Sequence, residues 1–334
     1  MKATLKGLFF VLFPLFLGVL SLSIGRFEVD FTVQVQILLS QFMDIEQTWT
    51  DMEEAAVIQL RLPRVILAIL IGGGLSIAGA ALQGMFANPL VSPDILGVSA
   101  GAGFGAALGI LLFGHGFSTQ IIALITGMLA IGITFLVGGF KKEMPIFMMV
   151  LAGVVTSALF QAFISLIKFV ADPEEKLPSI TYWLMGSLGT ASYYDILIGA
   201  PFIIIGMVIL LVLRWRINIL SLSEEEAKSL GISVAKTRWL VIFAATIITA
   251  SAVSIAGIIG WVGLIIPHIA RMLVGNNNRF VLPVSISIGG SYLLIIDNLA
   301  RTLTPAEIPL SILTAIVGAP FFAYLLMRTG GGWK

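Results

Sequence analysis

Long uncharged apolar runs alternate with short clusters of charge along this chain. An α-helix needs roughly 20 apolar residues to cross the hydrocarbon core of a bilayer. Ten runs reach or approach that length, so the sequence predicts an all-α polytopic membrane protein, with residues 1–334 as a single transmembrane domain. The predicted spans cover residues 7–25, 63–86, 95–113, 118–140, 145–167, 195–213, 239–258, 260–274, 281–300 and 308–327.

One pair of spans lacks a charged boundary between its members. The stretch from Trp239 to Ala270 holds 32 uncharged residues, too many for one span and few for two. Gly257, Gly260 and Gly263 offer a break in this stretch. We therefore expect one full helix followed by a short, partly broken one.

The distribution of basic residues predicts the orientation, because Lys and Arg are retained on the cytoplasmic side. With the N-terminus inside and ten spans, thirteen basic residues lie inside and six outside. The inner set is Lys2, Lys6, Lys141, Lys142, Arg214, Arg216, Lys228, Lys236, Arg238, Arg271, Arg279, Arg328 and Lys334, and the outer set is Arg26, Arg61, Arg64, Lys168, Lys176 and Arg301. Both termini are therefore expected in the cytoplasm. A signal peptide is a poorer account of residues 1–25, because no small-residue cleavage site follows them.

Composition agrees with a membrane protein. Of the 334 residues, 58% are hydrophobic and 11% charged, against about 25% charged in soluble domains, and the mean hydropathy is +1.05. The net charge of +1 does not indicate a nucleic-acid partner. Cysteine is absent, which excludes disulfides and thiolate metal sites. No phosphate-binding G-x-x-x-x-G-K-[ST] motif occurs, so we expect no nucleotide hydrolysis and no cofactor in this chain.

Residues 214–238 form the most charged inner loop and contain a predicted short helix. Ser223 is a capping residue, and Glu224, Glu225 and Glu226 suit the positive end of the helix dipole. Ala227 and Leu230 follow, and Gly231 ends the helix. Two turns are not stable alone in water, so this helix is expected to pack against something: either the bilayer surface or another protein.

Three outer arginines oppose the orientation bias. Arg61 and Arg64 lie at the mouth of the second span, and Arg301 at the end of the ninth. Snorkelling toward headgroup phosphates is one interpretation. Asp297 precedes Arg301 by four residues, so an intrahelical ion pair is expected to orient that arginine.

Two further features concern the inner face and the histidines. Asn88-Pro89-Leu90 ends the second span, because proline stops a helix. His268 is expected to be a hydrogen-bonding structural residue, since no second ligand accompanies it at metal-site spacing. His115 is interpreted as a loop residue.

Four blocks carry a family resemblance: residues 60–109, 221–233, 257–275 and 297–322. In order and spacing they resemble permeases of ATP-binding-cassette importers for iron–siderophore, haem and cobalamin, the type II binding-protein-dependent importers. The resemblance implies a multi-pass inner-membrane permease, not an enzyme, that passes a metal chelate into the cytoplasm. Iron–siderophore is the first expectation; haem, cobalamin and molybdate or tungstate remain open.

The resemblance also implies partners and residue roles. The partners are a second copy of this chain, two ATPase subunits that bind ATP and Mg²⁺, and one periplasmic or lipid-anchored binding protein. It implies that the 223–231 helix couples to the ATPase and that Arg61, Arg64 and Arg301 receive the binding protein. The inner gate is expected at Asn88, Pro89 and Leu90, with Ile146 and Phe147 matching the family by position alone.

Two other classes compete with an importer subunit. An ion-coupled secondary transporter usually places carboxylates or broken helices at mid-membrane, whereas these spans are almost free of acids. A membrane-embedded enzyme needs a cluster of His, Asp or Glu within the spans, and the sequence has none there.

Overall fold

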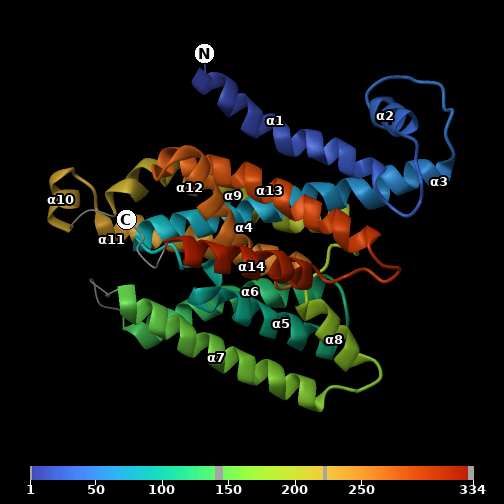
Figure 1. The fold of residues 1–334 in the computed structure, drawn as a ribbon. Helices are drawn as coiled ribbons and strands as arrows, with labels where there is room; N and C mark the ends of the chain where they lie inside the picture. Colours follow the sequence, from blue (N-terminus) through green and yellow to red (C-terminus); the bar gives the residue numbers. More distant parts are fainter. Residues whose placement is uncertain (1, 140–145, 221–223, 330–334) are drawn as a thin grey trace.

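The computed structural model describes residues 2–139, 146–220 and 224–329, and every regular element in these ranges is helical. Figure 1 shows the helices as one elongated bundle. In order they are α1 (Lys2–Ser23), α2 (Phe31–Ser40), α3 (Asp51–Glu54), the π-helical η1 (Ala55–Arg61), α4 (Leu62–Phe86), the 3₁₀ helix η2 (Pro93–Leu96), α5 (Val98–Phe113), α6 (Phe117–Gly138), α7 (Ile146–Val170), α8 (Lys176–Leu184), α9 (Tyr193–Ile219), α10 (Glu224–Ser229), α11 (Val234–Ala256), α12 (Val262–Val274), α13 (Asn278–Thr302) and α14 (Leu310–Thr329).

Each of the ten predicted spans coincides with a helix, namely α1, α4, α5, α6, α7, α9, α11, α12, α13 and α14. Six helices of the described chain are long and apolar enough to cross a membrane: Asp51–Phe86, Phe117–Gly138, Phe147–Val170, Tyr193–Ile219, Val234–Ala256 and Asn278–Thr302. The all-helical membrane fold is confirmed at this level. Ten crossings and cytoplasmic termini stay predictions.

The helix that contains α4 begins earlier than the apolar run does. α3, η1 and α4 form one continuous helix over Asp51–Phe86, which starts about a dozen residues before the predicted span. Its first turn carries a capping box, in which Thr50 accepts a hydrogen bond from the Glu53 amide and the Glu53 carboxylate accepts one from the Thr50 amide. The added turns project this helix beyond the bundle.

Helix α4 is the centre of the fold and contacts α9, α11, α12 and α13. Glycines permit these close approaches: a Cβ added at Gly79 would lie 1.9 Å from the Gly263 carbonyl oxygen on α12. One added at Gly72 would lie 2.3 Å from the Gly289 oxygen on α13. Small residues let helix backbones pack closely in a membrane, where the hydrophobic effect no longer drives association.

The predicted break between the seventh and eighth spans is confirmed. α11 ends at Ala256 and α12 begins at Val262, with Gly257 at φ +70° and Trp261 at φ +73° between them. Gly257 lies against the last turn of α8, where a Cβ would meet the Trp183 carbonyl oxygen at 2.3 Å. Gly263 lies inside α12 rather than in the break.

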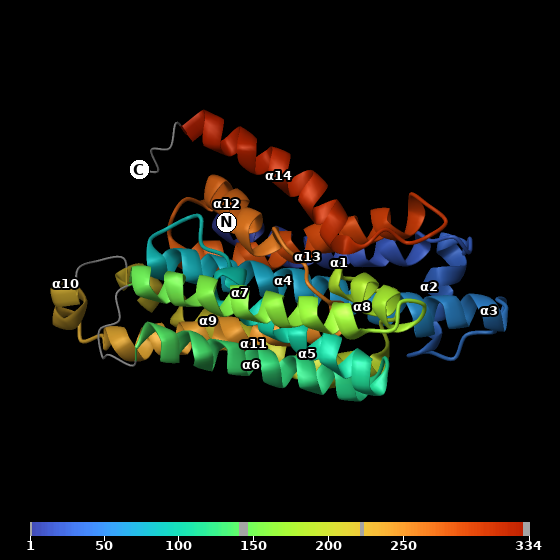
Figure 2. The ribbon, with the colours of Figure 1, turned by 90° about the horizontal axis from the view of Figure 1, so that it is seen from below.

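The two ends of the bundle differ. In Figures 1 and 2, α10 projects from one end, whereas α2, α3 and α8 lie toward the other. α1 begins, and α14 finishes, on the side nearer α10. We call these the α10 end and the α3 end.

Candidate functional site

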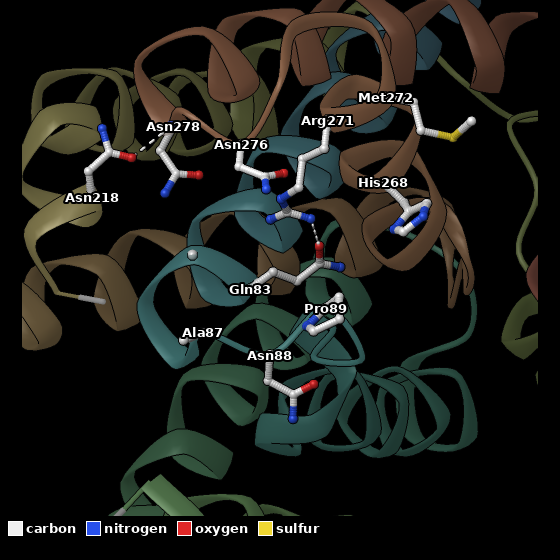
Figure 3. Close-up of a pocket in the computed structure, with 11 residues that line it drawn as sticks. Gln83, Ala87, Asn88, Pro89, Asn218, His268, Arg271, Met272, Asn276 and Asn278 are labelled. Carbon is white, nitrogen blue, oxygen red and sulfur yellow. Dashed lines mark hydrogen bonds between the residues drawn. The ribbon is translucent and has the colours of Figure 1, made fainter. Parts of the chain in front are cut away.

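A cavity of about 450 Å³ opens at the α10 end, around the last turn of α4 (Figure 3). Among the described residues, its polar side chains are five amides, one arginine and one histidine, with no carboxylate. The lining residues are Gln83, Gly84, Ala87, Asn88, Pro89, Asn218, His268, Arg271, Met272, Asn276 and Asn278. Four helices, α4, α9, α12 and α13, contribute to it.

A side-chain hydrogen bond between α12 and α4 crosses this cavity. An Nη of Arg271 donates to Oε1 of Gln83 (Figure 3). Gln83 Nε2 in turn donates to the carbonyl oxygens of Gly263 and Leu264, at 3.4 and 3.2 Å. The amide of Gln83 is therefore held with its oxygen toward Arg271, a neutral acceptor for a charged group.

The predicted gate turn forms one edge of the cavity. Ala87 ends α4 in the left-handed region at φ +47°, and the Asn88 amide donates to the Gln83 carbonyl at 3.1 Å. The Leu90 amide donates to Asn88 Oδ1 at 2.9 Å, which closes an Asx turn. The sequence thus contains its own signals for a sharp stop followed by a turn.

Not all predicted gate residues meet here. Asn88 and Pro89 line the cavity, and Leu90 follows them with 46% of its surface exposed. Phe147 is exposed on α7 and is not part of this wall. Ile146 begins α7, and its side chain lies outside the described part. The gate role of all five residues stays a prediction.

The histidines occupy different places. His268 lies on α12 in the wall of the cavity, near the inner end predicted for it. His115 lies in the short loop between α5 and α6, where its Nε2 contacts the Ser179 hydroxyl of α8. Among the described residues, no group of three or more His, Cys, Asp or Glu is placed to hold a metal ion.

The outer arginines are buried at the α3 end, and each has partners within the chain. Arg64 is 8% exposed, and its guanidinium pairs with two acidic side chains. Its Nε donates to both oxygens of Asp297 at 3.0 Å, and its Nη1 donates to Glu307 Oε1 at 2.8 Å. Asp297 has no exposed surface. This bidentate pairing joins α4 to α13 and to the loop after α13.

Arg61 and Arg301, each 6% exposed, tie the same region to the end of α1. Arg61 donates to the carbonyl oxygens of Leu22, at 2.7 Å, and Phe27. Arg301 donates to the carbonyl and hydroxyl oxygens of Ser21 at 2.8 Å.

The expected intrahelical pair is also present, with Arg301 Nε 3.8 Å from Asp297 Oδ2. Within this chain the three arginines therefore bind protein groups, and snorkelling does not describe them. Their role in docking a binding protein stays a prediction.

The predicted coupling helix is present as α10. It spans Glu224–Ser229; Ser223 lies outside the described residues, as do the side chains of Glu224 and Glu225. Gly231 adopts φ +75°, and the Ile232 amide donates to the Ala227 carbonyl at 3.2 Å, a helix-ending pattern that glycine favours.

The apolar residues of α10 and of the turn that follows it lie in two different environments. Ala227 is 1% exposed and belongs to the main core of this chain, while Leu230 is 55% exposed. Glu226 and Ser229 are exposed as well. The exposed side of α10 is therefore the side of Leu230, and Ala227 lies on its buried side. The ATPase-coupling role of both residues stays a prediction.

Sequence reasoning missed several of these residues. Glu307, Ser21 and Gln83 each pair with a residue far along the chain, so only the packed helices bring them together. A signal existed for Arg271, which interrupts an apolar helix beside His268. The Thr50-x-x-Glu53 pattern, which is typical of a capping box, also indicated the early start of this helix.

These features define a polytopic helical membrane protein with a cavity at one end and a small helix projecting beside it. The FecCD transport family matches residues 12–328, and the chain belongs to this family. It is a multi-pass permease subunit of an ATP-binding-cassette importer in the cell membrane, of the metal-chelate class, and is not itself catalytic.

Relatives of this chain carry different cargoes. The molybdate import permease of Haemophilus influenzae is 44% identical over 94% of this chain and 93% of its own length. The Fe(3+)-citrate import permease of Bacillus subtilis is 36% identical over 93% and 91%. A solved structure of an inward-facing metal-chelate type ABC transporter is 41% identical, covers 97% of this chain and 99% of its own, and has a TM-score of 0.86.

Proposed function

We propose that two copies of this chain form the transmembrane pathway of an importer driven by two ATPase subunits. The ATPase subunits hold ATP and Mg²⁺, and one binding protein delivers cargo at the α3 end. A twofold dimer places the same surface of each copy at one interface, which suits a pathway along the symmetry axis. Both termini and α10 lie in the cytoplasm, and the chain crosses the membrane ten times.

The exposed side of α10 is the observation that carries this proposal. A helix of six residues cannot be stable alone in water. This one is anchored by buried Ala227 and presents Leu230 outward. Such an arrangement suits a helix that enters a groove on another protein and transmits its movement to the attached helices, here α9 and α11.

The pathway is proposed to close near the cavity at the α10 end. Asn88 and Pro89 border that cavity, and Gln83 connects this turn to Arg271 on α12. The same helix, α4, carries Arg64 at its other end. A displacement of α4 or α12 that follows ATP binding would therefore move the gate turn directly.

For the binding protein, we propose docking at the α3 end, above Arg61, Arg64 and Arg301. Their burial supports an indirect role, in which they fix the loops that form the docking surface. Direct ion pairs to a partner would require these arginines to exchange their present acceptors.

The cargo is proposed to be a metal chelate or a metal oxyanion. Ferric siderophores and related chelates are the first expectation from the sequence blocks. The 44% identity to a molybdate permease supports a metal oxyanion as the cargo to the same degree. Haem and cobalamin stay candidates, since the haem permease of Yersinia pestis is 33% identical and a cobalamin permease of Halobacterium salinarum is 39% identical.

Co-purification tests the proposal. The chain is expressed with candidate ATPase and binding-protein partners, and the assembled complex is tested for ATP hydrolysis stimulated by loaded binding protein. Titration of that binding protein with molybdate, ferric siderophore, haem and cobalamin then assigns the cargo. If the chain binds no ATPase subunit, that result would contradict the proposed importer function.

The alternative is an ion-coupled secondary transporter. Asp297 is the acid closest to such a role, but it is paired with Arg64 and lies near a helix end. Transport by this chain alone, driven by a proton or sodium gradient, would favour that alternative.

A further inference from the structure

The charge of Arg271 is not balanced by any acid in the described chain. Arg271 is half-buried, and its side-chain partner is the neutral amide oxygen of Gln83. The ion pairs of the described residues involve other cations, and no Asp or Glu lines the cavity around it. A charge removed from water is costly unless a counter-ion or several hydrogen bonds accompany it.

Gln83 positions this arginine without neutralising it. Because the Gln83 amide nitrogen is occupied by two carbonyl oxygens of α12, its oxygen is the atom presented to the guanidinium. The remaining guanidinium N–H groups are left for the cavity. Arginine offers five donors in a planar fork that suits oxygen-bearing anions.

The neighbouring amides extend the same surface. Asn276 lines the same cavity (Figure 3) and is exposed. Asn278 is 6% exposed, and its Oδ1 accepts no hydrogen bond from the described residues. The side-chain nitrogen of Asn278 is a hydrogen-bond donor, and Asn278 lines the cavity, so it can offer a donor to a ligand. A volume of about 450 Å³ lies within the usual range for small-molecule pockets.

From this geometry we propose that the cavity binds an oxygen-bearing anion, with Arg271 as its charged contact and Asn276 and Asn278 as neutral donors. The chemistry is shared by a free tetrahedral oxyanion and by the carboxylate face of an anionic ferric chelate. The inference rests on the proposed importer function and deepens it: the cargo meets a weak anion site as it leaves the pathway.

The test uses the permease–ATPase complex in nanodiscs without nucleotide, titrated separately with molybdate and with ferric citrate. We expect saturable binding of at least one anion, weakened about tenfold or more in Arg271→Gln, the loss expected for one charge-assisted hydrogen bond. Arg271→Lys keeps the charge but not the fork and should bind with intermediate affinity. Molybdate binding alone assigns a free oxyanion, and ferric citrate alone assigns a chelate.

A second variant tests the site without removing the hydrogen bond between Arg271 and Gln83. Asn276→Asp adds a carboxylate to the wall of the cavity at an exposed position and should weaken anion binding by a similar factor. Asn277→Asp is the matched control, because Asn277 caps α13 through its side-chain oxygen and does not line the cavity. It should leave binding unchanged.

The inference is overturned if the wild-type complex transports cargo yet binds neither anion, or if Arg271→Gln and Asn276→Asp both bind as the wild type does. Failure of the chain to assemble with an ATPase is a separate result. That outcome contradicts the proposed function rather than the anion site.

Discussion

Arg64 on α4 and Asp297 on α13 form a buried ion pair, with Arg64 Nη2 2.9 Å from Asp297 Oδ1. The two residues are separated by 233 positions in the chain. Their pairing fixes the α3 end of the central helix to α13, and Arg64 extends the link to Glu307 in the following loop. This buried ion-pair network thus lies at the end opposite the cavity.

Asp297→Asn should destabilise the protein by about 3 kcal/mol, because removing one partner leaves a buried arginine charge undercompensated. Thermal unfolding of the purified protein in detergent measures this. Asp44→Asn is the control, since Asp44 is exposed and should have little effect. Equal stabilities for Asp297→Asn and wild type would contradict the assignment.

Glu307 gives the network a pH dependence. Burial alone would raise the pKa of Glu307, but the hydrogen bond and charge of Arg64 outweigh it and hold the pKa below its ordinary value of 4.5. The stabilisation is therefore complete above about pH 4.5, the pKa of the unfolded state, and is lost as the pH falls through the lower folded value. Glu307→Gln should lower the melting temperature at pH 7 and have a much smaller effect near pH 3. An effect that does not depend on pH would contradict this.

Cysteine accessibility tests the topology, and the chain has no native cysteine to interfere. Ser229→Cys on α10 and Met43→Cys between α2 and α3 are both at exposed positions. A membrane-impermeant thiol reagent applied from outside should label Met43→Cys and not Ser229→Cys. Labelling of both from the same side would contradict the orientation.

The exposed side of α10 predicts which substitution uncouples the ATPase. Leu230→Asp should reduce ATPase co-purification and transport while the permease remains folded, because Leu230 is 55% exposed. Ser229→Asp changes the charge of the neighbouring exposed position and is the matched control. Ala227→Trp should impair folding of the permease itself, since Ala227 is buried in its core. Unchanged ATPase association in Leu230→Asp would make α10 an ordinary loop helix.

Close packing of α4 against α12 is tested at Gly79. A Cβ there would lie 1.9 Å from a backbone oxygen, which cannot move without shifting α12. Gly79→Ala should therefore cost about 1–3 kcal/mol of stability. Gly132→Ala on α6 is the control, because nothing lies within 4 Å of the Cβ it would add. Equal stability of the two variants would contradict the close approach.

The sequence predicted features that depend on local pattern. Each of the ten spans predicted from apolar length coincides with a helix, and the glycines located the break before α12. The Asp297–Arg301 contact followed from the spacing of four residues on one helix.

Contacts between distant segments required the packed structure. Arg64 reaches Glu307 across 243 positions, and the burial of the three outer arginines depends on how α1, α4 and α13 meet. The continuation of α4 back to Asp51 was missed because its charged turns lie outside any apolar run. The cavity was missed because its lining residues come from four helices and the turns after them, and no single segment shows their convergence.

ATP-driven uptake into proteoliposomes tests the central claim most directly. The vesicles contain this chain with its ATPase subunits, enclose ATP and Mg²⁺ on the α10 side, and receive binding protein loaded with labelled molybdate or ferric chelate outside. The account predicts cargo accumulation that requires ATP, the ATPase and the binding protein together, and that is lost in Leu230→Asp. Accumulation driven by an ion gradient, by this chain without the ATPase, would contradict it.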